Sequence, residues 1–383
     1  MLFQTTPAHE ELRTKIRAFA EEEVKPIAFM LDQQNEFPTE AIAKFGEMGL
    51  MGIPFPKEYG GAGLDALSYA IAVEELARVD GGTGVILSAH VSLGSWPIFA
   101  FGTEEQKKKY LPLLASGEKI IAFGLTEPGA GSDAGGTCTT AVFDPETEEY
   151  VLNGRKCFIS AAPMADWTIV FAKTDLKAKG SKGISMFIVD MKLPGVSLGK
   201  HEEKMGIHGY PTSDVVLEDV RVGKDCLVGP LHKGFQYAMK TLDGGRLGMA
   251  AQAVGVAQSA LDEAVKYAKE RKQFGRRIAD FQGVSFMIAE MAADVEAARQ
   301  LVYHAAELKD KNMDATAACS IAKYFAAEAA NRCAYKAVQI HGGYGYIREY
   351  KVERIYRDAR ICSIYEGTSQ VQQMVIAASL LNK

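Results

Sequence analysis

The stretch KIIAFGLTEPGAGSDAGG (residues 119–136) marks the point at which the sequence changes from a helical to a β-rich pattern. It opens with a short run of β-branched and aromatic residues and continues into a turn segment rich in Gly, Pro, Ser and Asp. Similar short runs follow as far as DVVLEDV (214–220), separated by turn signals such as DPETEE and KLPGVS. This spacing predicts an antiparallel β domain over residues 119–229.

Helical patterns lie on both sides of this β-rich segment. Before it, apolar residues such as Leu12, Ile16 and Phe19 recur with a period near 3.6. After it, helix-forming residues dominate the stretches 233–271, 280–311, 314–341 and 363–382. A chain of 383 residues exceeds what one hydrophobic core usually holds. We therefore predict a multidomain α+β fold with an N-terminal helical domain (1–118), a middle antiparallel β domain (119–229) and a C-terminal four-helix bundle (230–383).

The composition excludes several classes of function. The net charge of -5 offers no electrostatic footprint for nucleic acid or an anionic membrane. The six cysteines form no C-x-x-C pair and have no metal-ligand spacing with histidine, so we expect neither a metal site nor disulfides. The first 19 residues lack the apolar run of a signal peptide, and no uninterrupted run of 18 apolar residues occurs. We expect a cytoplasmic protein without a membrane segment.

Several short motifs could carry chemistry, although each has a plain structural explanation. For the five motifs in chain order, the plain explanations are an inter-strand turn, a core aromatic residue on a strand, a helix C-terminus, a helix stop and a surface glutamate. Small residues beside hydroxyl groups let a backbone approach a ligand closely, and arginine beside glycine suits a pyrophosphate. The motifs are Leu125–Asp133, Asn153–Ser160, Arg271–Gly275 with Phe281–Gln282, Gln339–Tyr346 and Ile364–Ser369.

Taken together, in this order and at these distances, the motifs resemble the acyl-CoA dehydrogenase family over essentially the whole chain. The segments TEPGAGSDAGG, RKQFG, QIHGGYGY and IYEGTSQVQ are jointly very specific. The resemblance implies an FAD-dependent oxidoreductase that interconverts an acyl-CoA and its trans-2,3-enoyl-CoA. Three stretches are similar to short-chain (butyryl-CoA) dehydrogenases and to caffeoyl-CoA and other aryl-acryloyl-CoA reductases: Phe158–Pro163, Thr241–Arg246 and Gln339–Ile347.

The resemblance also assigns roles to individual residues. Residues that match those around the flavin of the same subunit are Phe123, Leu125, Thr126, Ser132, Phe158, Ile159, Ser160, Thr368 and Gln370. Residues that match those given to the FAD of a neighbouring subunit are Arg271, Phe274, Gln282, Gln339, Ile340, Gly342 and Gly343. This sharing implies a homotetramer built as a dimer of dimers. The acyl-CoA is expected to contact Ser132, Asp243, Arg246 and Gly367.

Glu366 matches the catalytic base of the family, which removes the α-proton of the substrate. A closed, apolar site would raise its pKa toward neutrality, as a general base requires. Some branches carry the base at the position of Gly245, where this chain has no side chain. The implied electron partner is an electron-transferring flavoprotein. Two other readings are an acyl-CoA oxidase, which passes electrons to oxygen, and a non-catalytic acyl-CoA-binding protein.

Overall fold

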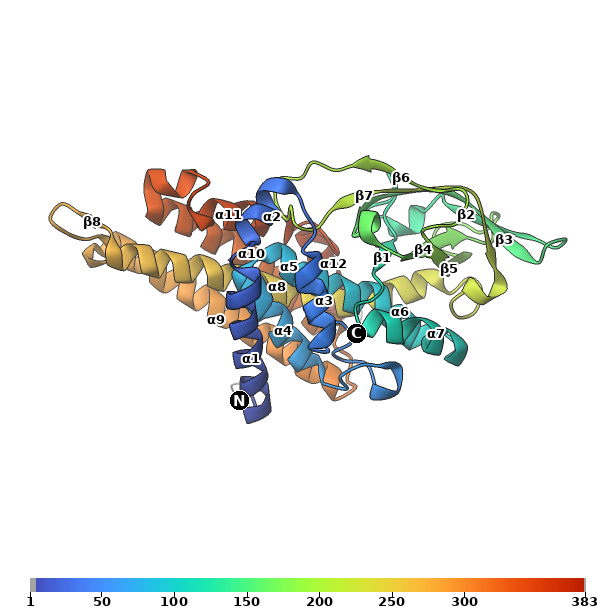
Figure 1. Ribbon diagram of the computed structural model, residues 1–383, viewed down its shortest axis with the longest axis horizontal. Helices are drawn as coiled ribbons and strands as arrows, with labels where there is room; N and C mark the ends of the chain where they lie inside the picture. Colours follow the sequence, from blue (N-terminus) through green and yellow to red (C-terminus); the bar gives the residue numbers. More distant parts are fainter. Residues whose placement is uncertain (1–4, 382–383) are drawn as a thin grey trace.

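The computed structural model describes residues 5–381, so residues 1–4 and 382–383 lie outside the description. Helices form the N-terminal and C-terminal parts, and strands form the middle part, as Figure 1 shows. This order confirms the predicted fold class. The N-terminal helices are α1 (Pro7–Phe19), α2 (Ala28–Gln34), α3 (Thr39–Glu47), α4 (Ala66–Val79), α5 (Gly81–Ala89), α6 (Trp96–Phe101) and α7 (Glu104–Ala115).

Side-chain caps explain where several of these helices begin. The Thr6 side chain accepts a hydrogen bond from the His9 backbone N–H at the start of α1, and Thr103 does the same for Gln106 at the start of α7. Asp65 caps α4 and Asp80 caps α5. Each cap satisfies an N–H group that has no partner within the helix.

One helical segment, Gly81–Phe101, combines α5, the π-helix His90–Ser95 and α6. Its mean hydropathy of 1.4 and its length would suffice to cross a membrane, although Ser and His residues interrupt its apolar runs. Within the molecule 72% of this window is buried, which is typical of a core helix in a folded domain. The sequence analysis did not single out this segment, and it forms one wall of the cavity described below.

The middle part is a seven-stranded sheet of mixed pairing, which corrects one detail of the predicted antiparallel β domain: most strand pairs are antiparallel, but two are parallel. The order is β1-β4-β2-β3-β7-β6, with β5 paired to β4. β1 runs parallel to β4, because the connection that contains the β2–β3 hairpin is long enough to bring the chain back to the same end of the sheet. The strands are β1 (Ile121–Gly124), β2 (Thr140–Asp144), β3 (Glu149–Ser160), β4 (Trp167–Lys173), β5 (Ile184–Asp190), β6 (Val196–His201) and β7 (Thr212–Gly223).

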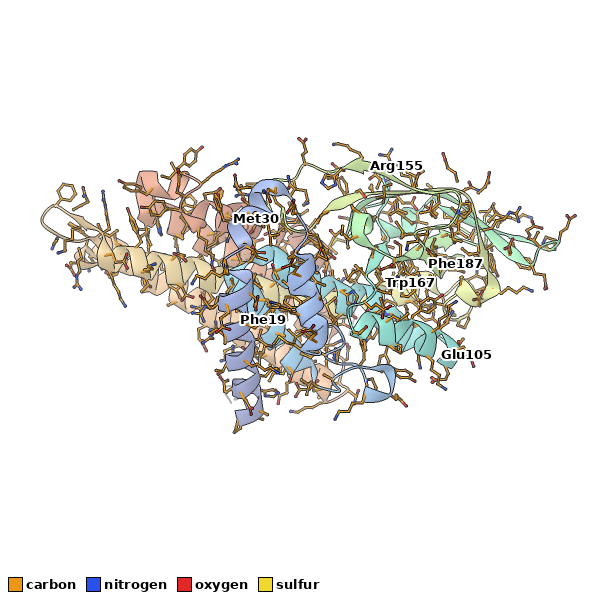
Figure 2. The ribbon with its side chains drawn as sticks, viewed as in Figure 1. Phe19, Met30, Glu105, Arg155, Trp167 and Phe187 are labelled. Carbon is orange, nitrogen blue, oxygen red and sulfur yellow. The ribbon has the colours of Figure 1, made fainter. Side chains whose placement is uncertain are left out.

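Two paired strands of this sheet, β4 and β5, bury both of their faces. Every residue from Thr168 to Ala172 in β4 and from Ile184 to Val189 in β5 is buried. Trp167 and Phe187, labelled in Figure 2, lie in this domain, where Phe187 packs edge-on against Tyr150. The largely apolar sequences of β4 and β5 reflect burial of both faces of each strand, whereas a strand with one exposed face would alternate apolar and polar residues.

The C-terminal part consists of α8 (Gly234–Glu270), α9 (Gln282–Asp310), α10 (Thr316–His341), α11 (Lys351–Ile361) and α12 (Ser369–Leu381). α8 packs against α4 and α10, so the two helical parts share one hydrophobic core. The sequence patterns did not indicate α11 or the short hairpin of β8 (Lys272–Gln273) and β9 (Arg276–Arg277). The helix predicted over 363–382 begins later, at Ser369, because residues 366 and 367 adopt left-handed backbone conformations.

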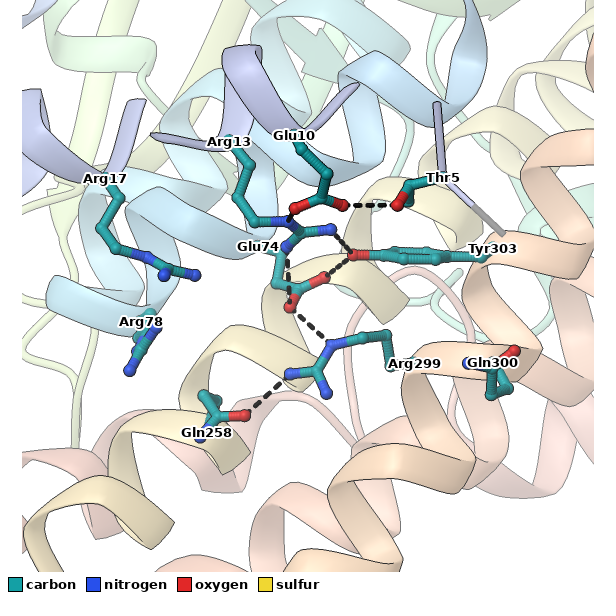
Figure 3. A pocket seen from close by; sticks show the side chains of 10 residues that line it. All are labelled: Thr5, Glu10, Arg13, Arg17, Glu74, Arg78, Gln258, Arg299, Gln300 and Tyr303. Carbon is teal, nitrogen blue, oxygen red and sulfur yellow. Dashed lines mark hydrogen bonds and ion pairs between the residues drawn. The ribbon is translucent and has the colours of Figure 1, made fainter. Parts of the chain in front are cut away.

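Charged side chains tie the N-terminal helix α1 to the C-terminal bundle. Arg13 donates to Glu75 at 2.8 Å, and Glu74 accepts hydrogen bonds from Arg299 at 2.9 Å and from Tyr303 at 2.7 Å. Figure 3 shows the part of this network that joins Arg13, Glu74, Arg299 and Tyr303, around a cavity between α1, α4, α8 and α9. Because buried glutamates already pair with Arg13 and Arg299, the network is a structural link between helices and not an anion site.

Candidate active site

A second cavity lies where all three parts of the chain meet. Its walls come from the helical segment 81–101, strands β1 and β3, helix α8, and the turn before α12. Most of its surface is apolar, and a few hydroxyl and charged groups converge on it, which is typical of ligand pockets. The lining residues include Ala89, Leu93, Phe123, Leu125, Thr126, Ser132, Phe158, Ile159, Ser160, Met239, Leu242, Arg246, Tyr365, Glu366 and Gly367.

The wall formed by β3 presents an aromatic ring to this cavity. A register shift between Lys156 and Ile159 interrupts the pairing of β3 with β7, and Phe158 adopts a left-handed backbone conformation at φ 57°. Such a bulge re-aims the side chain at the irregular position. Phe158 is 64% exposed, although it belongs to a strand with buried neighbours. A large exposed aromatic residue in a cavity wall is a surface on which a flat ligand can pack.

A buried ion pair shapes the loop that follows β1. Lys156 of β3 donates to Glu127 at 2.7 Å and to the Leu125 carbonyl at 3.3 Å. Glu127 also accepts hydrogen bonds from the Cys138 and Thr139 backbone N–H groups. Burial by itself would raise the pKa of Glu127, but Lys156 and these hydrogen bonds lower it to about 2. The pair thus holds Leu125 and its neighbours against β3.

Glu366 projects into the cavity from the turn between α11 and α12. Its Oε2 atom is buried and has no hydrogen-bond partner among residues 5–381. Burial raises the pKa of Glu366 to about 7, against the opposing attraction of Lys323 and Arg246. A buried carboxylate oxygen without a partner is costly unless a ligand group approaches it, so this position has the properties of a general base.

Gly245 of α8 provides the space for this carboxylate. A Cβ atom at position 245 would lie 2.4 Å from Glu366 Oε2 and 2.7 Å from Leu93 Cδ2. A side chain at position 245 would therefore force the Glu366 carboxylate and the Leu93 side chain to shift. The Glu366 carboxylate can occupy its position because residue 245 is a glycine.

Arg246 lies beside this glycine and is only 5% exposed. Its Nη1 atom donates to Asp243 at 2.7 Å, and its Nε atom has no acceptor among the described residues. Asp243 also accepts from Thr316 at 3.0 Å. Burial raises the pKa of Asp243, and Arg246 opposes this effect. Asp243 therefore contacts the cavity only through Arg246, while the free Nε atom of Arg246 remains available to a ligand.

The cavity gathers ten of the predicted site residues: Phe123, Leu125, Thr126, Ser132, Phe158, Ile159, Ser160, Arg246, Glu366 and Gly367. Four more, Arg271, Ile340, Gly342 and Gly343, line a separate surface cavity at the end of α10. There the Arg271 guanidinium lies 5.2 Å from the centre of the Tyr344 ring. The remaining predicted residues line neither cavity: Asp243, Phe274, Gln282, Gln339, Thr368 and Gln370.

Two predicted residues outside the cavities lie on the surface near the β8–β9 hairpin. Phe274 forms the tip of this hairpin and is 94% exposed, and Gln282 is exposed at the start of α9. Phe274 packs only edge-on against Phe281, with ring centres 6.0 Å apart. A fully exposed phenylalanine at a hairpin tip marks a surface suited to contact with another molecule.

His341 and Cys362, which could invite catalytic readings, lie outside the cavity. His341 stacks on Tyr267, and its Nδ1 atom lies 2.8 Å from the Ala337 carbonyl. Burial raises the pKa of Cys362 to about 12, so its thiol is protonated near neutral pH. No group of three or more potential metal ligands occurs among residues 5–381.

Several cavity residues were missed from the sequence. Ala89, Leu93, Met239 and Leu242 are ordinary apolar residues on helices, and only their three-dimensional positions distinguish them from core residues. The π-helix His90–Ser95 contains Leu93, and π-bulges are frequent at functional sites. Its sequence, HVSLGS, does not indicate a π-helix, so this feature could be recognised only in the structure.

The residues of this cavity fit the flavin of an FAD. Phe158 and Leu125 offer apolar surface to a flat ring, and the Thr126 and Ser160 hydroxyls can bond to its polar edge. The buried Oε2 atom of Glu366, which lacks a partner, faces the same space. The separate cavity around Arg271 offers a cation to a diphosphate.

Comparison with known proteins identifies the family. The N-terminal, middle and C-terminal domains of acyl-CoA dehydrogenase match residues 6–118, 122–220 and 232–381. The chain is 56% identical to the caffeyl-CoA reductase-Etf complex subunit of Acetobacterium woodii over 97% of this chain and 98% of that one.

Solved structures agree with this comparison. Butyryl-CoA dehydrogenase from Megasphaera elsdenii superimposes with a TM-score of 0.97 and 46% identity over the full length of both chains. An acyl-CoA dehydrogenase from Bacillus anthracis in complex with FAD superimposes with a TM-score of 0.92 and 39% identity, over 99% of this chain and 68% of that one. The protein therefore belongs to the acyl-CoA dehydrogenase family and is an FAD-dependent oxidoreductase.

Proposed function

We propose that the protein interconverts a short-chain or aryl-propionyl-type acyl-CoA and its trans-2,3-enoyl-CoA, with an electron-transferring flavoprotein as its electron partner. The observation that carries this proposal is the buried Oε2 atom of Glu366, which has no hydrogen-bond partner among residues 5–381 and lies at a largely apolar cavity. The similarity to a caffeyl-CoA reductase-Etf complex subunit supports the reductive direction and the flavoprotein partner.

In this proposal Glu366 is the base that takes the α-proton of the acyl-CoA, and it returns that proton during enoyl-CoA reduction. A pKa near 7 allows the carboxyl group to gain and lose a proton at neutral pH. When bound, FAD supplies the acceptor or donor of the hydride at the β-carbon. The Glu366 backbone N–H has no acceptor among the described residues and could bond to the thioester oxygen, where negative charge develops.

The proposed roles of the other residues follow from their positions. Leu125, Thr126 and the segment Phe158–Ser160 would face the two sides of the flavin, with Phe123 behind them and Ser132 and Arg246 toward the acyl-CoA. Gly367 leaves room beside the base, and Asp243 orients Arg246. Thr368 and Gln370 would contact the distal part of the cofactor.

We further propose a homotetramer in which each FAD is shared between two subunits. The surface cavity around Arg271, with Ile340, Gly342 and Gly343, would hold the diphosphate of a partner's FAD. Exposed residues beside it, namely Phe274, Gln282 and Gln339, would be covered by that partner. A cytoplasmic location agrees with six free cysteines and with the burial of the apolar segment 81–101.

Anaerobic flavin bleaching tests this function. We would mix the FAD-loaded protein with propionyl-, butyryl- and 3-phenylpropionyl-CoA and follow the flavin absorbance. In the reverse direction, NADH with a cognate electron-transferring flavoprotein should support reduction of crotonyl-, acryloyl- or cinnamoyl-CoA, and NADH alone should not. An oxidase would instead form stoichiometric peroxide in air, and a non-catalytic acyl-CoA-binding protein would bind these thioesters without bleaching. Either result would replace the proposal.

A further inference from the structure

The turn that carries Glu366 has an unfavourable backbone conformation. Glu366 adopts φ 53° and Gly367 adopts φ 92°, both in the left-handed region. This region costs a residue with a side chain roughly 1–2 kcal/mol, so the surrounding structure must hold Glu366 there. The groups that hold this turn therefore determine where the carboxylate points.

Two buried side chains from different helices hold the turn. Lys323 of α10 donates from Nζ to the Gly367 carbonyl at 2.7 Å. Gln372 of α12 donates to the same carbonyl at 2.9 Å and to the Glu366 carbonyl at 3.2 Å. Both side chains are fully buried, with 0% exposure. The carbonyl groups of Glu366 and Gly367 thus accept hydrogen bonds from side chains that are shielded from water.

Lys323 brings more than a hydrogen bond, because its ammonium group is charged and has no direct counterion. No carboxylate lies within ion-pair distance of Lys323 in the part of the chain that the structure describes. Burial lowers its pKa to about 8, and attraction to Cys362 and Glu366 opposes this effect. An uncharged side chain of similar length would fill the space without this desolvation cost.

The charged group that benefits from Lys323 is Glu366. Among the groups around Glu366, the two cations are Lys323 from α10 and Arg246 from α8, and Arg246 is already paired with Asp243 at 2.7 Å. Burial raises the pKa of the surrounding tyrosine hydroxyls, which are neutral near pH 7 as a result: Tyr69, Tyr210 and Tyr365. Lys323 is attracted by Glu328 as well, but of these two cations it is the one that makes no direct ion pair with a carboxylate among residues 5–381.

We propose that Lys323 is a positioning residue for the reaction: its ammonium group locks the Glu366–Gly367 turn through the Gly367 carbonyl and supplies a positive charge that favours the ionised form of the Glu366 carboxylate. The inference rests on the proposed role of Glu366 as the base. It makes Lys323 an electrostatic partner of a base that it does not touch.

The test compares Lys323→Met with Lys323→Arg and with Lys351→Met as a matched control. Lys351 is a partly buried lysine that also donates to a backbone carbonyl, that of Arg78 at 3.1 Å, but it lies at a different cavity. In the FAD-loaded protein, the rate constant of flavin bleaching would be measured from pH 5.5 to about 9.5. Removal of the charge should raise the apparent pKa of bleaching by about one unit, the lower end of what an opposite charge contributes.

At pH 6 this shift corresponds to a rate about tenfold below that of the wild type, with a smaller ratio at high pH. Lys323→Arg should restore the wild-type pH profile, and Lys351→Met should leave it unchanged. A loss of rate that is the same at every pH would assign Lys323 a purely structural role and overturn the proposal.

A second measurement keeps this inference separate from the proposed function. The titration of the Glu366 carboxyl group can be followed by 13C NMR in wild type and Lys323→Met, using Glu366→Gln to assign the signal. An upward shift in the variant supports the inference even if no tested acyl-CoA bleaches the flavin. An unchanged titration refutes it even if the enzyme is active. If Lys323→Met does not fold, Lys323→Gln replaces it in both measurements.

Discussion

The space at Gly245 leads to the sharpest prediction of this structure. In Gly245→Ala, the new Cβ atom would lie 2.4 Å from Glu366 Oε2, whereas an ordinary contact needs at least 3.4 Å, so the carboxylate must move by about 1 Å. The Leu93 side chain, at 2.7 Å, must move as well. Overpacking of this kind costs about 1–3 kcal/mol, and a 1 Å displacement of a reacting group can cost about 100-fold in rate.

Gly244→Ala is the matched control for stability, since it lies on the same helix. Its Cβ atom would meet only Ser92 Cβ, at 3.9 Å. Replacing glycine by alanine within a helix stabilises it by roughly 0.5–1 kcal/mol, and this gain applies to both variants. We therefore expect Gly245→Ala to be less stable than Gly244→Ala by about 1–3 kcal/mol.

Urea unfolding of the FAD-loaded proteins would measure the stability difference, and anaerobic flavin bleaching would measure the rate of proton abstraction in Gly245→Ala. We expect bleaching to be about 100-fold slower than in the wild type. If Gly245→Ala were as stable as Gly244→Ala and bleached at wild-type speed, the carboxylate would not occupy the position described here, and the link between positions 245 and 366 would be wrong.

Three further predictions concern the base, the buried ion pair and the surface cavity around Arg271. Glu366→Gln should retain FAD and acyl-CoA binding but lose proton abstraction by several orders of magnitude; bleaching at near wild-type speed would exclude Glu366 as the base. Glu127→Gln leaves the buried ammonium of Lys156 unpaired and should cost about 3–5 kcal/mol in urea unfolding at pH 7. Because the pKa of Glu127 is lowered to about 2 in the folded protein, its stabilisation is present above pH 4.5 and is lost as the pH falls toward 2, so the variant should show a weaker acid dependence; an unchanged acid limb would contradict this. Arg271→Ala should lose FAD and weaken oligomerisation together, measured by flavin absorbance and light scattering; full FAD occupancy in a monomer would exclude the shared site.

Much of the architecture could be predicted because it depends on local periodicity and composition. Helical spacing before residue 118 and after residue 230, and β-rich runs between them, reflect which faces of each element must be buried. The parallel pairing of β1 with β4 could not be predicted, because strand partners are chosen by the path of the chain and not by the strands themselves. Helix α11 was missed because its many charged residues hide a narrow buried face formed by Val352, Ile355 and Ala359.

The residue types of the candidate site were present in motifs whose order and spacing resemble one family, so Glu366, the segment around Thr126 and the segment around Phe158 could be named from the sequence alone. Their convergence on one cavity is a tertiary property, because Glu366 is distant in sequence from both of the other segments. Lys323 could not be named in this way. On its own helix it is one lysine among alanines, and only packing places its ammonium group behind the base.

The sequence by itself determined which elements form, which family the motifs resemble and which carboxylate is suited to act as a base, because these follow from local residue order. The tertiary structure alone decided the properties of that carboxylate. Desolvation raises the pKa of Glu366, and the charge of Lys323 opposes this effect. The space left at Gly245 lets the Glu366 carboxylate occupy its position in the cavity. Each of these effects depends on atoms that are distant in sequence and close in space.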